Sequence, residues 1–392
     1  MKILFVHNNY GNNNSGEEHA SQGLADLLIK NGHTVQWYRK SSDIIQDSFK
    51  MKIAAFFSGI YNPKAVKELK SKILDFKPDV IQVQNVYPFI SPGILRMINR
   101  LHIPVVMRCP NYRLFCPTGL HLDEKDEVCE KCLTGLKELN TVLKNCEKNR
   151  FKSIGYALRN FIGRTIWKLQ DNMDAYIVQS NFQKNKFIEN GIKSDKLFVI
   201  PGLTPALKIE TSNELAEYVS FVGRASIEKG IVEFLKVAKE LPTTKFAVVG
   251  SLDPTLESLK KKSPLNVHWT GFLSGKEYDM FYQKSKIVVV PSKWYEGFPN
   301  VITRAMQHAK PVITTNIGAM QSIIDHEING LLVEPGSSTQ LKNAVERLHS
   351  NDEMCKKMGL LGREKAKIDY NDTIVYKELM NAYNFILKTV NK

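Results

Sequence analysis

Residues 291–300 read PSKWYEGFPN, and this stretch decides how the rest of the chain is interpreted. It follows the apolar run Ile287–Val290 and precedes a helical pattern that runs from Val301 to Met306. The sequence therefore predicts a buried strand, then a loop that carries the acid Glu296, then a helix N-terminus. An α/β protein presents ligand-binding groups at such a place, because its loops follow the carboxyl ends of parallel strands.

A second loop of the same kind lies nearer the N-terminus. The predicted strand at 217–222 runs into Gly223 and Arg224, and Lys229 follows shortly after. Two cations that could hold phosphate and one acid that could contact a sugar thus sit at strand ends in one half of the protein. The alternative is that Arg224 and Lys229 are solvated surface charges.

The length and composition predict a soluble protein of two domains. A chain of 392 residues is too long for one ordinary core, and 43% apolar with 24% charged residues is typical of globular proteins. No apolar run approaches the roughly twenty residues that span a membrane. The apolar run after Lys2 is too short for a signal peptide, so we expect a cytoplasmic protein.

The formal net charge is +14, which favours a polyanionic partner. The candidates are nucleic acid, an anionic membrane and phosphorylated ligands. The sequence contains no zinc-finger, RNA-recognition or helix-turn-helix signature, so we expect no nucleic acid. A basic surface without a dedicated partner is the alternative.

Strand-like and helix-like segments alternate along the chain and predict an α/β fold. Strands separated by single helices imply right-handed parallel units whose sheets are covered on both faces. The Pro- and Gly-containing stretch 201–205 interrupts the alternation. We expect two Rossmann-like domains that face each other across a cleft, over residues 1–202 and 203–372. The last helix, within 373–392, is expected to cross back to the first domain.

Two segments of the first domain mix aromatic side chains with lysine and arginine. One is the insertion 48–61, and the other is a predicted helix that follows Lys148. Such a mixture is typical of a helix on an anionic membrane surface. Helices that pack on their own domain, with solvated cations, are the alternative.

A second insertion, 109–150, holds five of the six cysteines. Cys116, Cys129, Cys132 and Cys146 are spaced C-x12-C-x2-C-x13-C, which predicts a closed structural zinc site of four thiolates. Zinc binding would stabilise an insertion that has no core of its own. The alternative is four unrelated thiols. Cys109 and Cys355 are expected to be packing residues.

A series of short motifs resembles the retaining glycosyltransferases of family 4, which have the GT-B fold. The motifs in chain order are Ser15-Gly16-Glu17-Glu18, Phe221-Val222-Gly223-Arg224 with Lys229-Gly230, Gly271-Phe272-Leu273, Pro291-Ser292, Glu296-Gly297-Phe298-Pro299, Lys310-Pro311-Val312-Ile313 and Asn329-Gly330-Leu331-Leu332-Val333. The resemblance covers nearly the whole chain. Residues 111–117 and the following cysteines look like a subgroup that acts in surface-polysaccharide assembly.

The resemblance implies a role for each matching residue. Arg224 and Lys229 would hold the donor diphosphate, and Glu296 would bind hydroxyls of the donor sugar, so these three form the implied catalytic set. The implied donor-binding residues are Gly16, Gly223, Arg224, Lys229, Phe272, Glu296, Gly297, Phe298, Pro299, Asn300, Val301 and Arg304. The acceptor would enter on the side of the N-terminal domain.

The chain contains no Asp-x-Asp motif, which argues against a catalytic divalent metal and for cationic side chains at the phosphate. The predicted function is therefore metal-independent transfer of a sugar from a nucleotide-sugar to a lipid-linked or oligosaccharide acceptor, with retention. It would take place in surface polysaccharide biosynthesis, on the inner face of the cell membrane.

Three positions depart from the family pattern. Arg304 replaces a second glutamate, Pro110 replaces a histidine of the subgroup, and Ser322 replaces an acid in the loop that begins at Gly318. Arg304 could pair with Glu296 or meet an additional anionic group on the ligand. These departures favour an alternative, a non-catalytic GT-B protein that serves as the partner of an active transferase. A sugar-nucleotide epimerase of related fold fits less well.

Overall fold

The computed structural model describes residues 1–10, 16–45, 49–204, 207 and 216–390. The chain divides into two compact units. The first contains residues 1–125, 129–203 and 373–392, and the second contains residues 126–128 and 204–372. Each unit holds one six-stranded sheet, and every neighbouring pair of strands is parallel. The predicted α/β class with two Rossmann-like sheets is confirmed.

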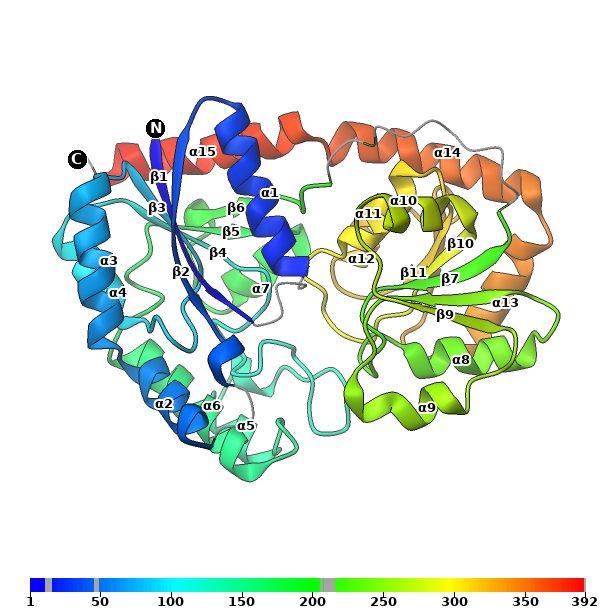
Figure 1. Cartoon of the computed structure of the whole chain (residues 1–392), viewed down its shortest axis with the longest axis horizontal. Coiled ribbons are helices and arrows are strands. Elements are labelled where there is room, and N and C mark those ends of the chain that lie inside the picture. Colours follow the sequence, from blue (N-terminus) through cyan, green and yellow to red (C-terminus); the bar gives the residue numbers. More distant parts are fainter. Residues whose placement is uncertain (11–15, 46–48, 205–206, 208–215, 391–392) are drawn as a thin grey trace. The chain divides into compact units, whose positions relative to one another are not determined.

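The sheet of the first unit has the strand order β2-β1-β3-β4-β5-β6 (Figure 1). Its strands are β1 (Lys2–Asn9), β2 (Thr34–Ser41), β3 (Val80–Asn85), β4 (Val105–Arg108), β5 (Ala175–Val178) and β6 (Leu197–Val199). Its helices are α1 (Gly16–Lys30), α2 (Phe49–Ile60), α3 (Pro63–Phe76), α4 (Gly93–Arg100), α5 (Leu139–Leu143), α6 (Arg150–Thr165), α7 (Asn181–Glu189) and α15 (Asp372–Val390). Short 3₁₀ turns lie at Asp43–Ile45, Lys131–Leu133 and Ser194–Lys196.

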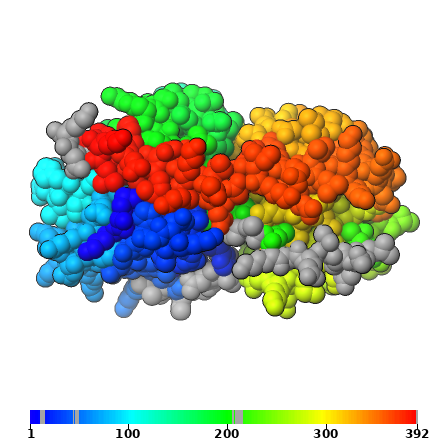
Figure 2. Space-filling view, turned by 90° about the horizontal axis from the view of Figure 1, so that it is seen from above, coloured from blue at the N-terminus to red at the C-terminus, as the bar shows by residue number. Residues whose placement is uncertain are grey.

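The C-terminal helix α15 completes the core of this first unit. Its apolar side chains, among them Val375 and Leu379, pack in one cluster with Ile3 and Phe5 of β1 and Leu24 of α1. In the same place the buried Tyr383 donates a hydrogen bond to Gln82 of β3. Figure 2 shows α15 in red along the surface of the unit, next to the blue N-terminal segment. An amphipathic helix at the end of the chain thus buries one face of the first sheet.

The sheet of the second unit has the order β12-β11-β10-β7-β8-β9. Its strands are β7 (Tyr218–Val222), β8 (Phe246–Val249), β9 (Val267–Gly271), β10 (Ser285–Val290), β11 (Val312–Thr315) and β12 (Gly330–Val333). Its helices are α8 (Ile231–Glu240), α9 (Glu257–Lys261), α10 (Gly275–Lys284), α11 (Asn300–Gln307), α12 (Met320–Ile323), α13 (Ser338–His349) and α14 (Asp352–Asp369), with a 3₁₀ turn at Pro254–Leu256.

Helices cover both faces of this second sheet (Figure 1). Phe234 of α8 and Leu341 of α13 pack on one face, whereas Tyr282 of α10 and Met306 of α11 pack on the other. From β7 the chain continues through β8 to β9 at one edge of the sheet. It then returns to β10, beside β7, and continues through β11 to β12 at the other edge, so the strand order reverses between β7 and β10. In sheets of this kind, ligands bind beyond the carboxyl ends of the strands at such a reversal.

Helix α14 packs closely on the end of α11, and a glycine permits this. A Cβ atom at Gly359 would lie 2.0 Å from the carbonyl oxygen of Ala309. A Cβ atom at Gly362, one turn later, would make ordinary contacts with the side chains of Met306, at 3.4 Å, and Asn329, at 3.8 Å. The two glycines of one helix therefore differ in what they contribute to packing.

We predict that Gly359→Ala destabilises the protein by about 2 kcal/mol or more, because the backbone of α14 must move away from α11. Gly362→Ala is the matched control. It should be neutral or stabilise by up to about 1 kcal/mol, since alanine favours a helix interior. Urea denaturation of both variants measures this, and equal stability of the two would contradict the packing described.

Candidate functional site

The loop after β7 carries two cations beside an acid. Arg224 donates a hydrogen bond to Glu228, and the hydroxyl of Ser226 donates to the same carboxylate oxygen at 2.7 Å. The side chain of Arg224 is 53% exposed, so its other N–H groups can reach a ligand. Lys229 follows directly after Glu228, and α8 begins two residues later.

The loop after β10 carries the acid Glu296, which is 5% exposed. Three donors converge on its Oε1 atom: Lys229 Nζ at 2.5 Å, Ser292 Oγ at 2.7 Å and Trp294 Nε1 at 3.0 Å. Oε2 accepts no hydrogen bond from any residue in the described ranges. The three donors therefore fix the orientation of the carboxylate and leave its second oxygen available to a ligand hydroxyl.

A glycine holds the two loops together. Gly230 caps α8 with a φ of 79°, and a Cβ atom there would lie 2.0 Å from the carbonyl oxygen of Pro291. A residue with a side chain would be strained by the backbone and would also clash with the second loop. The backbone N–H of Lys293 also donates to the carbonyl of Glu228 at 2.8 Å. The separation of Lys229 and Glu296 is thus set by backbone contacts.

The N-terminus of α11 follows the second loop directly. Pro299 occupies the N-cap position and no side chain caps the helix. The first backbone N–H groups of a helix have no partner within the helix, and they attract anions. Oδ1 of Asn300 is buried and has no hydrogen-bond partner among the described residues. Two cations, one oriented acid and one helix N-terminus are the components of a site for a phosphorylated sugar.

The structure places the remaining donor-site candidates as follows. Gly297 and Pro299 are buried in the second loop, and Phe298 packs edge-on against Tyr370 with ring centroids 5.3 Å apart. Phe272 follows β9 and is 46% exposed, and Gly16 begins α1 in the first unit. No contact joins Phe272 to the Lys229–Glu296 pair within the part of the chain that the structure describes. The contacts given above therefore bring together Arg224, Lys229, Glu296 and the start of α11.

Arg304 pairs with a different acid from the one that the sequence suggested. Its guanidinium donates to Oδ1 of Asp279 on α10, through Nε at 2.8 Å and Nη2 at 2.5 Å. His308 lies 3.3 Å from the same oxygen. The expected pairing of Arg304 with Glu296 is not formed, since Lys229 occupies that carboxylate. Asp279 carried no recognisable signal in the sequence.

The other two departures differ in their surroundings. Pro110 lines a small pocket in the first unit, and the Ser322 hydroxyl donates to the carbonyl of Ala319 at 2.8 Å. The sequence also gave no reason to choose Ser292 or Trp294 as supports of Glu296. Glu228 could have been found, because it follows Arg224 by four residues in a loop that leads into a helix.

The cysteine insertion forms no metal site in the structure. Sγ of Cys116 lies 3.3 Å from the Thr118 hydroxyl, and Sγ of Cys132 lies 3.5 Å from the Thr141 hydroxyl. A hydrogen bond between Cys132 and Cys116 lowers the pKa of Cys116 well below its usual range and raises that of Cys132. The described residues include no group of three His, Cys, Asp or Glu side chains that could hold a metal ion.

The zinc predicted at Cys116, Cys129, Cys132 and Cys146 is therefore not supported. The Cys116 and Cys132 thiols bond to each other and to threonine hydroxyls, and no third His, Cys, Asp or Glu side chain of the described residues joins them in a group that could hold a metal ion. All four are free thiols. Cys109 and Cys355 are buried. No helix within the described ranges is both long enough and apolar enough to span a membrane.

Comparison with known proteins finds similarity to glycosyltransferases. Residues 206–365 match the family model "Glycosyl transferases group 1". An uncharacterised 42.6 kDa protein in the cps region of Klebsiella pneumoniae is 27% identical, over 79% of this chain and 83% of that protein. The capsular polysaccharide biosynthesis glycosyltransferase CapM of Staphylococcus aureus is 29% identical, over 58% of this chain and 63% of its own length.

Solved structures share the fold over nearly the whole chain. Sucrose-phosphate synthase from Thermosynechococcus elongatus aligns with a TM-score of 0.73 at 17% identity, over 99% of this chain and 100% of that one. HepE of Anabaena in complex with UDP aligns with a TM-score of 0.66 at 15% identity, over 98% of this chain and 100% of its own. The fold is therefore GT-B, as the sequence predicted.

We predict that Lys229→Met destabilises the protein by about 2 kcal/mol at pH 7, because it leaves a buried carboxylate without its cation. The double variant Lys229→Met/Glu296→Gln should recover most of that loss. Arg224→Met is the control, and its exposed pair with Glu228 should cost no more than about 1 kcal/mol. Chemical denaturation of the wild type and the three variants measures the free energy of unfolding of each. Equal losses in the single and double variants would show that Lys229 does not stabilise the fold through Glu296.

Proposed function

We propose that this chain transfers a sugar from a nucleoside-diphosphate donor with retention of configuration, and the similarity of residues 206–365 to the group 1 glycosyl transferases supports this proposal. The carboxylate of Glu296 carries the proposal. It is buried, it is oriented by three donors, and it keeps one oxygen for a ligand beside Lys229. An acid so held can accept hydrogen bonds from sugar hydroxyls.

In the proposed reaction, Arg224, Lys229 and the N-terminus of α11 receive the donor diphosphate. The bond between the anomeric carbon and the diphosphate oxygen breaks, and a new bond to the acceptor hydroxyl forms on the same face of the sugar. The proton of that hydroxyl passes to the departing phosphate oxygen, so no side-chain base is required. Positive groups aimed at the leaving oxygen lower the barrier, because the diphosphate gains negative charge as the bond breaks.

Cationic side chains take the part that a divalent metal plays in other transferases, which makes the proposed reaction metal-independent. The relatives support a role in polysaccharide assembly, since one is a capsular polysaccharide glycosyltransferase and another is encoded in a cps region. HepE, which shares the fold, binds UDP. We therefore propose a nucleotide-sugar as donor and a glycan of a surface polysaccharide as acceptor.

The proposal of a non-catalytic partner protein is less favoured. It rests on three departures from the family pattern. Of these, Arg304 donates hydrogen bonds to Asp279, and the Ser322 hydroxyl donates to the carbonyl of Ala319 within its own helical turn. The three residues implied to be catalytic remain in place.

We predict that Glu296→Ala and Lys229→Ala each lower transfer by at least about 100-fold, because each removes a charge at the reacting sugar phosphate. The donor for the assay is first identified by calorimetry, as the sugar of uridine, guanosine, cytidine or adenosine diphosphate that binds. The anomeric configuration of the transfer product is then determined by NMR. Lys245→Ala, which breaks an exposed ion pair with Glu217, is the matched control. Full turnover in both active-site variants, or an inverted product, would reject the proposed mechanism.

The acceptor is proposed to be presented at an anionic membrane surface, because one face of the first unit is apolar and basic. The exposed stripe of α6 contains Phe151, Ile154, Leu158 and Phe161, and α2 and α5 beside it expose Ile53, Phe57, Leu139 and Leu143. Lys50 lies at the start of α2, Lys148, Arg150 and Lys152 lie at or just before the start of α6, and all four are exposed. We call these twelve residues the α2–α6 surface. Apolar contacts and cations together bind anionic lipid, each surface cation adding about 1 kcal/mol.

The aromatic residues of the predicted helix divide between two roles. Trp167 stacks on Tyr61 and donates to the carbonyl of Ile60, so it is a packing residue. Arg164 pairs with Glu138 through two hydrogen bonds. Phe151 and Phe161 are exposed and belong to the α2–α6 surface.

We predict that Phe151→Ser/Phe161→Ser lowers flotation with vesicles that contain anionic phospholipid by at least about tenfold. The reason is that two exposed aromatic side chains that would be buried in the lipid are lost. Leu265→Ser is the control, since Leu265 is fully exposed in the second unit. Binding to purely zwitterionic vesicles should be weak for every variant. Unchanged flotation of the double variant would reject the α2–α6 surface as the site of lipid contact.

A further inference from the structure

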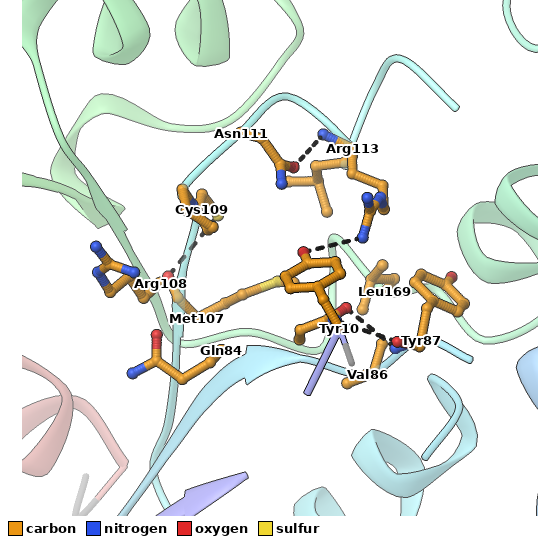
Figure 3. Close-up of a pocket in the computed structure, with 13 residues that line it drawn as sticks. Tyr10, Gln84, Val86, Tyr87, Met107, Arg108, Cys109, Asn111, Arg113 and Leu169 are labelled. Carbon is orange, nitrogen blue, oxygen red and sulfur yellow. Dashed lines mark hydrogen bonds between the residues drawn. The ribbon is translucent and has the colours of Figure 1, made fainter. Parts of the chain in front are cut away.

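The first unit holds a group of buried polar side chains that the proposed donor site does not use. His7 on β1, Gln84 on β3 and Arg108 on β4 are 2%, 2% and 3% exposed. The three strands are neighbours, and the register pairs Gln82 with Val106 and Val83 with Met107, so Gln84 and Arg108 come next to each other. Figure 3 shows these two side chains together at one side of a pocket.

These side chains lack partners within the described part of the chain. Both ring nitrogens of His7, both amide atoms of Gln84 and Nη1 of Arg108 are buried without a hydrogen bond. Arg108 forms no hydrogen bond or ion pair with any described residue. The Glu17 carboxylate interacts electrostatically with Arg108 but forms no hydrogen bond with it. Native proteins rarely leave buried polar groups without hydrogen bonds. These groups can therefore donate to or accept from a polar molecule that enters the site.

The charges around the group favour a negative ligand. Arg113 lines the same pocket, donates to the Tyr10 hydroxyl at 3.2 Å, and keeps a buried Nε without a partner. Burial lowers the pKa of His7 to about 4, with Arg39 and Arg108 adding to the effect, so the ring is neutral at pH 7 and one nitrogen can donate. Glu17 is the acid that opposes Arg108 and Arg113, and burial raises its pKa.

The place in the fold also suits a ligand. The strand order of the first sheet reverses between β1 and β3, and the pocket lies beyond the carboxyl ends of β3 and β4. Ligands of parallel α/β sheets bind at this kind of position. Glu17 lies in the first turn of α1, so the positive end of that helix faces the same region.

We propose that His7, Gln84 and Arg108 form a subsite for an oxyanion, a carboxylate or a phosphate, carried by the acceptor. This inference rests on the proposed transferase function and adds the chemical class of its acceptor. Arg108 offers a planar fork of N–H groups that matches two oxygens of one oxyanion, and Gln84 and His7 supply neutral donors beside it. The acceptor is then an acidic or phosphorylated glycan.

Binding of small oxyanions to the full chain tests the subsite. The probes are sodium glucuronate and inorganic phosphate, with glucose as the neutral counterpart, measured by thermal shift and calorimetry in a Lys229→Ala background that weakens the donor site. At least one oxyanion should bind, and glucose should not. Arg108→Gln should weaken that binding by at least about tenfold, since a charged hydrogen-bond donor is lost. Arg100→Gln, an exposed arginine on α4, is the control and should change nothing.

Gln84→Glu provides a second, opposite test. It places a carboxylate beside Arg108, so it should abolish oxyanion binding and raise the melting temperature of the ligand-free protein. Preference for glucuronate would identify an acidic sugar, and preference for phosphate a phosphorylated glycan. Unchanged oxyanion binding in Arg108→Gln, or in Gln84→Glu, overturns the subsite.

Nucleotide-sugar binding, measured on the single variants at positions 84 and 108, separates this inference from the proposed function. Donor binding without an effect of Arg108 on oxyanions rejects the subsite alone. Arg108-dependent oxyanion binding without any donor binding rejects the transferase assignment alone.

Discussion

The buried carboxylate of Glu296 is the constraint on which the second unit depends. A negative charge at 5% exposure is costly unless charged and neutral donors surround it, and Lys229, Ser292 and Trp294 meet that need on a single oxygen. Because those donors come from the loops after β7 and β10, both loops must keep their positions. Gly230 makes this possible by letting the two backbones touch. The geometry of the site thus follows from the hydrogen bonds that the buried Glu296 carboxylate requires.

The first unit treats a buried charge in the opposite way. Arg108 is 3% exposed, yet no described residue pairs with it, and Gln84 beside it is equally unsatisfied. Both sheets place polar groups at or beyond the carboxyl ends of strands, close to the point where the strand order reverses. The Lys229–Glu296 set is hydrogen-bonded within the protein, whereas Arg108 interacts with Glu17 without a hydrogen bond and keeps a buried donor for the proposed ligand. Self-compensated charges position a ligand, whereas uncompensated charges contribute most of their energy on binding it.

The sequence predicted the sheets well because parallel strands that are buried on both faces are apolar throughout, as Ile287–Val290 illustrates. It also indicated the residues that follow strand ends, including Arg224 and Glu296. It could not indicate partners that only the tertiary fold brings together. Asp279 on α10 accepts a hydrogen bond from Arg304 on α11. The Trp294 indole donates to Glu296 within a loop, where no periodic pattern indicates which way a side chain points. The cysteine spacing suggested convergence on a metal, but spacing alone does not set where four sulfurs point.

Arg304 shows why one substituted residue is weak evidence for lost function. A guanidinium at a position where an acid was expected reverses the local charge, which suggested a damaged donor site. In the structure Asp279 neutralises that charge, and all three of its hydrogen bonds fall on Oδ1. Its second oxygen accepts from no described residue, so a carboxylate is still offered beside α11, now from α10. Position 304 therefore carries a cation that the neighbouring helix balances, and its identity alone does not determine the charge of the site.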